Sequence, residues 1–267
     1  MLGYMGMVIL AFVMLFPFYV LCYVAINNRS NPLSRGVFVL PDITGENFIT
    51  AWQRGNLGGA AWNSFLITVG SLILIVLLGA SAGYTIARYP NKMNKTIFTI
   101  FLCCMMVPGI INTVPLYNIM RRIHGINTHW AMILLLAANR LPYCVFLYKQ
   151  FVETMSRDLE EAATLDGCSK FRAYWKVTFP LMKPVTSTVV IISSVNFWNN
   201  YSQAVFFLQE KKMYTLPLAM KQFVLENTKN WNGISSAAII SAVPMVILFL
   251  CLQKYFIKGL SAGAVKG

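Results

Sequence analysis

The sequence predicts an all-α membrane protein with six membrane-spanning helices. Of its 267 residues, 57% are hydrophobic and only 12% are charged, whereas about 25% of the residues in a soluble domain are charged. A helix needs about 20 apolar residues to cross the hydrocarbon core of a bilayer. Six windows of the sequence meet this requirement, and we expect them to form a single transmembrane domain over residues 1–267. They are residues 4–26, 65–87, 96–117, 129–148, 185–207 and 234–256.

The first window is expected to remain as a helix rather than to be cleaved as a signal peptide. No Lys or Arg precedes it, and residues 4–26 exceed the roughly 7–15 apolar residues of a signal sequence. An Ala-x-Ala cleavage site does not follow it either.

The second window ends in a run of small residues, Gly79-Ala80-Ser81-Ala82-Gly83. Small residues spaced four apart allow two helices to approach each other closely. We therefore expect this face to be a packing surface, and a specific dimerisation motif is the less favoured alternative.

The third and fourth windows contain helix breakers. Pro108-Gly109, followed by Asn112 and Pro115, interrupts the third window, and Asn139-Arg140-Leu141-Pro142 interrupts the fourth. Breakers at membrane depth are tolerated where neighbouring groups or water satisfy the freed backbone. A charged Arg within a span is costly unless it faces the bundle or reaches an interface. We expect both segments to lie inside a helix bundle or beside a cavity.

Composition excludes several classes of function. The 22 basic residues are spread singly or in pairs through the connections, which is typical of loops near anionic lipid headgroups rather than of nucleic-acid binding. The six cysteines lack C-x-x-C spacing, and two histidines are too few for a His-based metal cluster. Neither a Ser/His/Asp set nor a G-x4-G-K-[ST] phosphate loop is evident. We expect no enzyme activity, no metal and no cofactor in this chain.

The connection between the fourth and fifth windows, residues 150–184, holds five of the nine acidic residues of the chain. We call it the 150–184 segment. Ser156 and Ser169 are placed to cap two short helices, and Gly167 between them suits a chain reversal. The expected apolar faces consist of Met155, Leu159, Ala162 and Ala163 in the first helix and of Phe171, Tyr174, Trp175 and Thr178 in the second.

Two kinds of partner are open for these amphipathic helices. Tyr174 and Trp175 with nearby lysines are typical of a helix that lies on a membrane surface. The first helix carries Asp158, Glu160 and Glu161, which argues against anionic lipid as its main partner, and its adjacent alanines form a shallow face. A protein groove therefore suits the first half of the segment better.

The segment also carries a family pattern. Glu161-Ala162-Ala163-x3-Gly167-x9-Val177-x-Phe179-Pro180 resembles the E-A-A-x3-G-x9-I-x-L-P signature of the membrane subunits of bacterial ABC importers. Val177 and Phe179 stand in place of the usual Ile and Leu. Four further stretches resemble the carbohydrate branch of that family, which includes the maltose permease subunit MalG. They are Trp62-Asn63-Ser64, Ala87-Arg88-Tyr89-Pro90, Thr215-Leu216-Pro217 and residues 258–267.

This resemblance implies a permease of the bacterial cytoplasmic membrane with six spans and both termini in the cytoplasm. The positive-inside rule alone does not decide the orientation, because the basic residues divide almost evenly between the two sides. The 150–184 segment would be the cytoplasmic loop that couples the permease to an ATPase. The implied contacts are Glu160, Glu161, Ala162, Ala163, Asp166, Gly167 and Pro180 in this segment and Lys258, Gly259 and Gly263 near the C-terminus.

The resemblance also implies the partners. A second permease subunit would complete a heterodimer, two ATPase subunits would bind ATP and Mg²⁺, and an extracytoplasmic solute-binding protein would deliver the solute. We expect the complex to import a carbohydrate, with an oligosaccharide favoured, by alternating access. The alternatives are a non-sugar solute, a membrane scaffold or sensor that binds an ATPase without transport, and a stand-alone secondary transporter.

The fifth window supplies the candidate translocation path. Amide groups bind sugar hydroxyls and aromatic rings pack on the apolar faces of sugars, and this window holds both. On a continuous helix its amide residues share one stripe, which we expect to face a cavity. The alternative is hydrogen bonding between helices without any ligand. The candidate residues are Asn196, Trp198, Asn199, Asn200 and Gln203, together with Arg140 of the fourth window.

Overall fold

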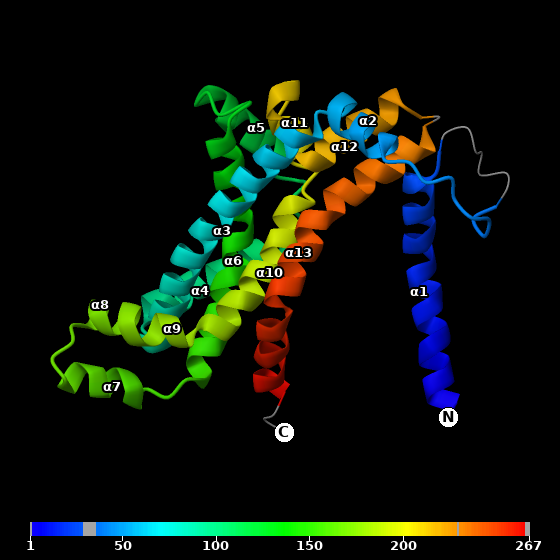
Figure 1. Cartoon of the computed structure of the whole chain (residues 1–267). Helices are drawn as coiled ribbons and strands as arrows, with labels where there is room; N and C mark the ends of the chain where they lie inside the picture. The colour runs from blue at the N-terminus through cyan, green and yellow to red at the C-terminus, as the bar shows by residue number, and fades with distance from the viewer. Residues whose placement is uncertain (1, 29–35, 229, 265–267) are drawn as a thin grey trace. The chain divides into compact units, whose positions relative to one another are not determined.

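The computed structural model describes residues 2–28, 36–228 and 230–264, and these residues are almost wholly helical (Figure 1). Within them the β-structure is limited to an isolated bridge between Asn27 and Ile43. The prediction of an all-α membrane protein is confirmed.

The helices follow one another along the chain. They are α1 (Leu2–Ile26), α2 (Glu46–Arg54), α3 (Leu57–Arg88), α4 (Lys92–Met106), α5 (Thr113–Arg122), α6 (His129–Thr154), α7 (Asp158–Leu165), α8 (Lys170–Ala173), a π-helical turn (Tyr174–Thr178), α9 (Phe179–Leu181), α10 (Lys183–Trp198), α11 (Ala204–Phe207), a 3₁₀ turn (Lys211–Met213), α12 (Leu216–Glu226) and α13 (Trp231–Ala264).

The chain divides into two compact units. Unit 1 comprises Met1–Ser64 and Glu210–Val246, and unit 2 comprises Phe65–Gln209 and Ile247–Gly267. The single transmembrane domain over residues 1–267 stays a prediction.

Among the described residues, four helices are long and apolar enough to cross a membrane, and a fifth is obtained if one bent pair counts as a single span. The two helices of this pair are bent by 68° relative to each other. The number of six spans therefore stays a prediction. The four helices are Tyr4–Ile26, Leu57–Arg88, His129–Thr154 and Trp231–Cys251, and the bent pair is Lys170–Leu181 with Lys183–Trp198.

The third window does not form a single helix over residues 96–117. α4 ends at Met106, and Val107 has the extended backbone (ψ 120°) that a residue before proline prefers. The 15 residues of α4 extend for about 22 Å, which is less than the roughly 30 Å of hydrocarbon in a bilayer. The break expected at Pro108-Gly109 is present. By contrast, α6 continues through Pro142 without interruption.

Unit 1 is organised around the end of α1. The last carbonyl groups of a helix lack donors within the helix, and here the side chains of two asparagines supply them. Asn47 Nδ2 donates to the carbonyl oxygens of Ala25 and Asn27 at 2.9 and 2.7 Å. Asn232 Nδ2 donates to those of Val24 and Asn27 at 2.9 and 2.8 Å. These bonds attach α1 to α2 and to the first turn of α13.

Two of the sequence stretches noted above meet at the start of α3. Asn63 Nδ2 donates to the carbonyl oxygen of Lys212 at 2.9 Å. The Ser64 hydroxyl accepts a hydrogen bond of 2.7 Å from the backbone N–H of Leu216, the first residue of α12. Pro217 occupies the first turn of α12, where its missing N–H leaves no partner unsatisfied. The two stretches thus hold unit 1 together across 152 residues of sequence.

α6 is the central helix of unit 2. Cys144, Val145, Tyr148 and Val152 on it are fully buried. The Tyr148 hydroxyl donates to Thr186 Oγ1 of α10 at 3.1 Å.

The small-residue run at the end of α3 packs against α6, as predicted. A Cβ atom added at Gly83 would lie 2.6 Å from the Cβ of Tyr148 and 2.9 Å from the backbone nitrogen of Lys149. One added at Gly79 would lie 3.1 Å from the Cβ of Cys144. Real Cβ atoms do not approach other atoms to less than 3.0 Å, so the two helices approach this closely because Gly83 has no side chain.

Gly83→Ala should therefore destabilise the protein although alanine is the better helix former. The gain in helix propensity is about 1 kcal/mol, whereas overpacking against backbone and Cβ atoms that cannot move away costs about 1–3 kcal/mol. Gly6→Ala in α1 is the matched control, because a Cβ there meets nothing within 4 Å. Thermal unfolding of the purified protein should show a lower midpoint for Gly83→Ala only. Equal midpoints for the two variants would contradict the close packing.

Candidate functional site

The 150–184 segment consists of two short helices that fold back on each other (Figure 1). The Ser156 hydroxyl accepts a hydrogen bond of 3.1 Å from the N–H of Asp158, where α7 begins. Gly167 has a positive φ of 83°, which favours glycine and reverses the chain. Ser169 caps the second helix by accepting a hydrogen bond from the N–H of Arg172. Local residue chemistry thus produces the expected helical hairpin.

Glu160 lies on the inner side of α7 and is held by the end of α3. Arg88 Nε donates to Glu160 Oε1 at 2.8 Å, and the Tyr84 hydroxyl donates to Oε2 at 2.9 Å. Only 7% of the Arg88 side chain and 17% of the Glu160 side chain are exposed. Arg88 Nη2 also donates to the carbonyl oxygens of Met155 and Ser156 at 3.2 and 3.5 Å. Both oxygens of the Glu160 carboxylate therefore accept a hydrogen bond from α3.

The second helix of the segment, formed by α8, the π-helical turn and α9, contacts the same part of α3. Tyr174 is buried, and its ring centroid lies 4.8 Å from that of Tyr84. Its hydroxyl lies 3.3 Å from the hydroxyl of Ser81. The rings of Trp175 and Phe179 both contact the Tyr174 ring and lie tilted by 55° to each other, with centroids 5.0 Å apart.

The other residues that the sequence suggests for coupling do not share one face. Glu161 and Ala162 are exposed, whereas Ala163 is buried inside the hairpin. Of the two adjacent alanines only Ala162 is exposed, because neighbouring helical side chains point in different directions, and their role in coupling stays a prediction. Two large apolar side chains of the segment are also exposed, with 88% of Leu165 and 75% of Phe171 accessible. Asp166, Gly167 and Pro180 are also exposed.

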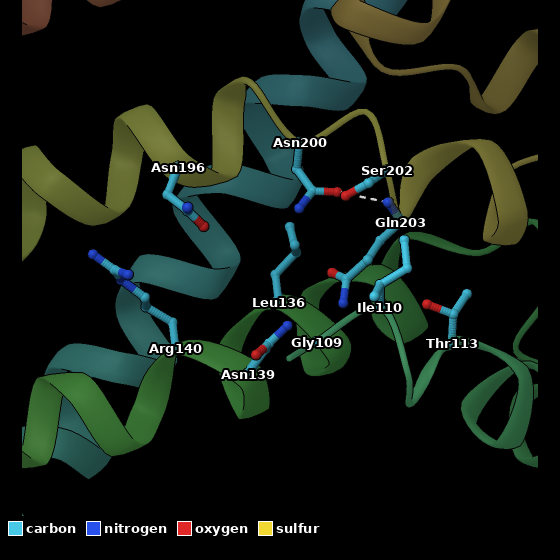
Figure 2. A pocket seen from close by; sticks show the side chains of 10 residues that line it. All are labelled: Gly109, Ile110, Thr113, Leu136, Asn139, Arg140, Asn196, Asn200, Ser202 and Gln203. Carbon is cyan, nitrogen blue, oxygen red and sulfur yellow. Dashed lines mark hydrogen bonds between the residues drawn. The ribbon is translucent and has the colours of Figure 1, made fainter. Parts of the chain in front are cut away.

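A second candidate site is a cavity of about 220 Å³ in unit 2, shown in Figure 2. It lies between the break after α4, the middle of α6 and the end of α10. Most of its lining is polar, with amide, hydroxyl and guanidinium groups. The lining residues are Gly109, Ile110, Thr113, Leu136, Asn139, Arg140, Asn196, Asn200, Ser202 and Gln203.

Arg140 and Gln203 lie at opposite sides of this cavity (Figure 2). The Arg140 guanidinium lies 4.2 Å from the ring centroid of Tyr143, and its Nε donates to the Ser193 hydroxyl at 3.4 Å. Gln203 is 7% exposed, and its Oε1 is buried without a hydrogen-bond partner among the residues that the structure describes. The backbone N–H of Gln203 donates to Asn200 Oδ1 at 3.1 Å. The cavity therefore offers both donors and a free acceptor.

The expectation of one helical stripe of amides is wrong. α10 ends at Trp198, and Asn199 already has a non-helical backbone. Asn196, Asn200 and Gln203 still reach the cavity because the chain turns there, whereas Trp198 and Asn199 do not line it. Trp198 is buried and Asn199 is exposed.

Sequence reasoning missed Tyr84, Thr113 and Ser202. Each is an ordinary residue on its own element, and only the fold brings it to the site. Gly109 and Asn139 belong to the two interrupted stretches that were expected to lie inside a bundle or beside a cavity, and both line the cavity. Arg88 stood in a stretch that the sequence singled out only for its family resemblance. The proposed C-terminal contacts, Lys258, Gly259 and Gly263, lie outside the residues whose side chains the structure describes.

Comparisons with known proteins agree along nearly the full length of the chain. Residues 75–262 match the family described as binding-protein-dependent transport system inner membrane component. The chain is 41% identical over 252 residues to the melibiose/raffinose/stachyose import permease protein MelC of Bacillus subtilis (strain 168), covering 94% of this chain and 91% of that protein. It is 30% identical to the arabinooligosaccharides transport system permease protein AraQ of Halalkalibacterium halodurans, with coverage of 98% and 95%.

A solved structure shares the fold. The crystal structure of a bacterial ABC transporter involved in the import of the acidic polysaccharide alginate contains a chain that matches with a TM-score of 0.83 and 21% identity, over 96% of this chain and 95% of that chain. The chain thus belongs to the family of binding-protein-dependent transport system inner membrane components, the membrane-spanning permease subunits of ABC importers.

Proposed function

We propose that this permease subunit imports an oligosaccharide by alternating access, driven by separate ATPase subunits. The observation that carries the choice of solute is the polar cavity of Figure 2, whose amide and hydroxyl groups suit a ligand rich in hydroxyls. The relatives support it, since they are named for melibiose, raffinose and stachyose and for arabino-oligosaccharides.

The proposed complex contains a second permease subunit, two ATPase subunits that bind ATP and Mg²⁺, and an extracytoplasmic solute-binding protein. The description of the family as binding-protein-dependent supports the last of these. A chain in a structure of the alginate transporter in complex with an alginate pentasaccharide-bound periplasmic protein shares the fold, with a TM-score of 0.69. We place the complex in the bacterial cytoplasmic membrane, with six spans and with both termini of this subunit in the cytoplasm.

The exposed face of the hairpin within the 150–184 segment, which runs from Asp158 to Leu181, is the proposed ATPase contact. Glu161 is exposed and forms no ion pair among the described residues, so its carboxylate is available to a cationic group of the ATPase. Leu165, one turn after Glu161 on α7, and Phe171 on α8 are exposed and would add apolar area to the interface, which stabilises association. Residues 258–263 remain the proposed second contact.

The cavity is the proposed part of the translocation path. The unpartnered Oε1 of Gln203 accepts a hydrogen bond from a sugar hydroxyl, while Asn139, Asn196 and Asn200 donate to sugar oxygens. Leaving a buried acceptor without a partner costs about 1–3 kcal/mol, and a passing ligand that donates a hydrogen bond relieves that cost transiently. The path would thus bind sugars without holding them tightly.

The wild-type complex in liposomes separates the alternatives. Uptake of a labelled raffinose-type or arabinose-type oligosaccharide should require both ATP and the binding protein. ATP hydrolysis without uptake of any solute would favour a scaffold or sensor. Uptake without ATP would favour a secondary transporter, and uptake of non-sugar solutes alone would refute the choice of substrate.

Glu161→Lys should abolish coupling to the ATPase while the permease remains in the membrane. The substitution replaces an exposed acid with a base and would repel the cationic partner. Glu153→Lys is the charge-matched control, because Glu153 on α6 pairs with Lys149 within its own helix. We expect Glu161→Lys to lose most of the ATPase that copurifies with the wild-type permease and to lower uptake about tenfold or more. Equal loss in the two variants would argue against a specific contact.

Gln203→Met should lower uptake without lowering stability. Methionine keeps the length of the side chain and removes the buried acceptor, so the thermal unfolding midpoint should stay equal or rise. Uptake should fall about fivefold, which corresponds to one lost hydrogen bond of about 1 kcal/mol. Asn200→Leu should act in the same direction, whereas Asn199→Leu, a substitution of the neighbouring amide outside the cavity, should leave uptake unchanged. Wild-type uptake in Gln203→Met would remove this cavity from the path.

A further inference from the structure

The last two turns of α3 contact both arms of the 150–184 segment. The first arm is α7, and the second is the continuous run of α8, the π-helical turn and α9. Ser81, Tyr84 and Arg88 are spaced three and four residues apart, so they lie on one face of the helix. Arg88 and Tyr84 bind Glu160 of α7, and Tyr84 and Ser81 contact Tyr174 of the second helix. Tyr84 thus contacts the two arms at once.

The contact with α7 is strong for its size. Both oxygens of the Glu160 carboxylate are used, and the ion pair is largely shielded from water. Charge-assisted hydrogen bonds are about twice as strong as neutral ones, and removal of one partner leaves the other charge without compensation. Arg88 also donates to the carbonyl oxygens of Met155 and Ser156. These bonds fix the connection that leads from α6 into α7.

The covalent exits of the segment are weak mechanical links by comparison. At one end Met155 has an extended backbone (ψ 136°) between α6 and α7. At the other end the chain bends by 68° between Leu181 and Lys183. Breaks of this kind let an element pivot about a few backbone torsions. Without the side-chain contacts, the segment would be free to rotate while α6 and α10 stay in place.

α3 passes any displacement on to α6 because the two are in close contact. Gly79 and Gly83 bring the α3 backbone against Cys144 and Tyr148, one turn from the residues that hold the segment. Closely packed helices move as one body rather than deforming continuously.

We propose that Arg88, Tyr84 and Glu160 are positioning residues that fasten the 150–184 segment to α3, so that α3 receives the movement that the ATPase imposes on the segment. The inference rests on the proposed function for the source of this movement. Glu160 then acts inside the permease, whereas Glu161 next to it faces the ATPase.

The test compares Glu160→Gln with Tyr84→Phe in the assembled complex. Glu160→Gln keeps the shape of the side chain and removes its charge, and Tyr84→Phe removes one donor while keeping the ring contact with Tyr174. Copurified ATPase and ATP hydrolysis should stay near wild type in both. The number of solute molecules imported per ATP hydrolysed should fall about fivefold or more in Glu160→Gln and less in Tyr84→Phe. The double variant should be no worse than Glu160→Gln, because both changes act on one carboxylate.

Glu153→Gln is the control, since it breaks an ion pair of the same 2.8 Å length within α6 and leaves the fastening intact. Its import per ATP should equal that of the wild type. A wild-type ratio in Glu160→Gln would overturn the inference. So would loss of copurified ATPase in Glu160→Gln, because Glu160 would then be an ATPase contact like Glu161.

The rate of amide hydrogen exchange in the complex measures how firmly α7 is held against α3, and it needs no transport assay. Exchange in residues 158–165 should become faster in Glu160→Gln than in the wild type or in Glu153→Gln, because α7 loses its hold on α3. Unchanged exchange there would refute the fastening. Failure of the proposed function has a different signature, which is the absence of uptake by the wild-type complex.

Discussion

The ion pair between Arg88 and Glu160 is the interaction on which the position of the 150–184 segment against α3 depends. Two charges that are mostly withdrawn from water are stable only when their remaining hydrogen-bonding groups are also satisfied. Here the second carboxylate oxygen binds Tyr84, and the guanidinium binds two carbonyl groups of the chain that leads into α7. The 150–184 segment is consequently an ordered part of unit 2 that is joined to three helices. A flexible linker would not transmit a displacement.

A second constraint comes from the backbone in the membrane. Where a spanning helix is interrupted, its freed N–H and C=O groups must find partners in protein or in a water-filled cavity. The chain is interrupted after α4 and again after α10, and both interruptions line the same cavity with Arg140 of α6. The breaks and the candidate solute site are therefore one feature. The irregular backbone that costs helix stability is also what presents polar groups to the cavity.

The sequence was most informative where the chemistry is local. Pro108 predicted the end of α4, Gly167 predicted the chain reversal, and Ser169 predicted a helix start, because each acts within one turn of itself. It was least informative where the partner is distant. Arg88 and Glu160 are 72 residues apart, and their separate stretches do not show that the two meet. The end of α10 at Trp198 was missed because neither Pro nor Gly marks it.

In both candidate sites, neighbouring residues of the same type lie in different environments. Successive side chains on a helix point about 100° apart, so Glu160 of α7 is turned toward α3 while Glu161 is exposed. Asn199 and Asn200 follow the end of α10, and the chain turns there so that Asn200 reaches the cavity while Asn199 does not. The E-A-A signature begins at Glu161, the exposed residue that we propose as an ATPase contact. The fastening proposed here lies outside that signature, because one partner directly precedes it and the other belongs to the end of α3. A short pattern records a surface that a partner must fit, whereas an internal link between distant stretches becomes visible only in the folded chain.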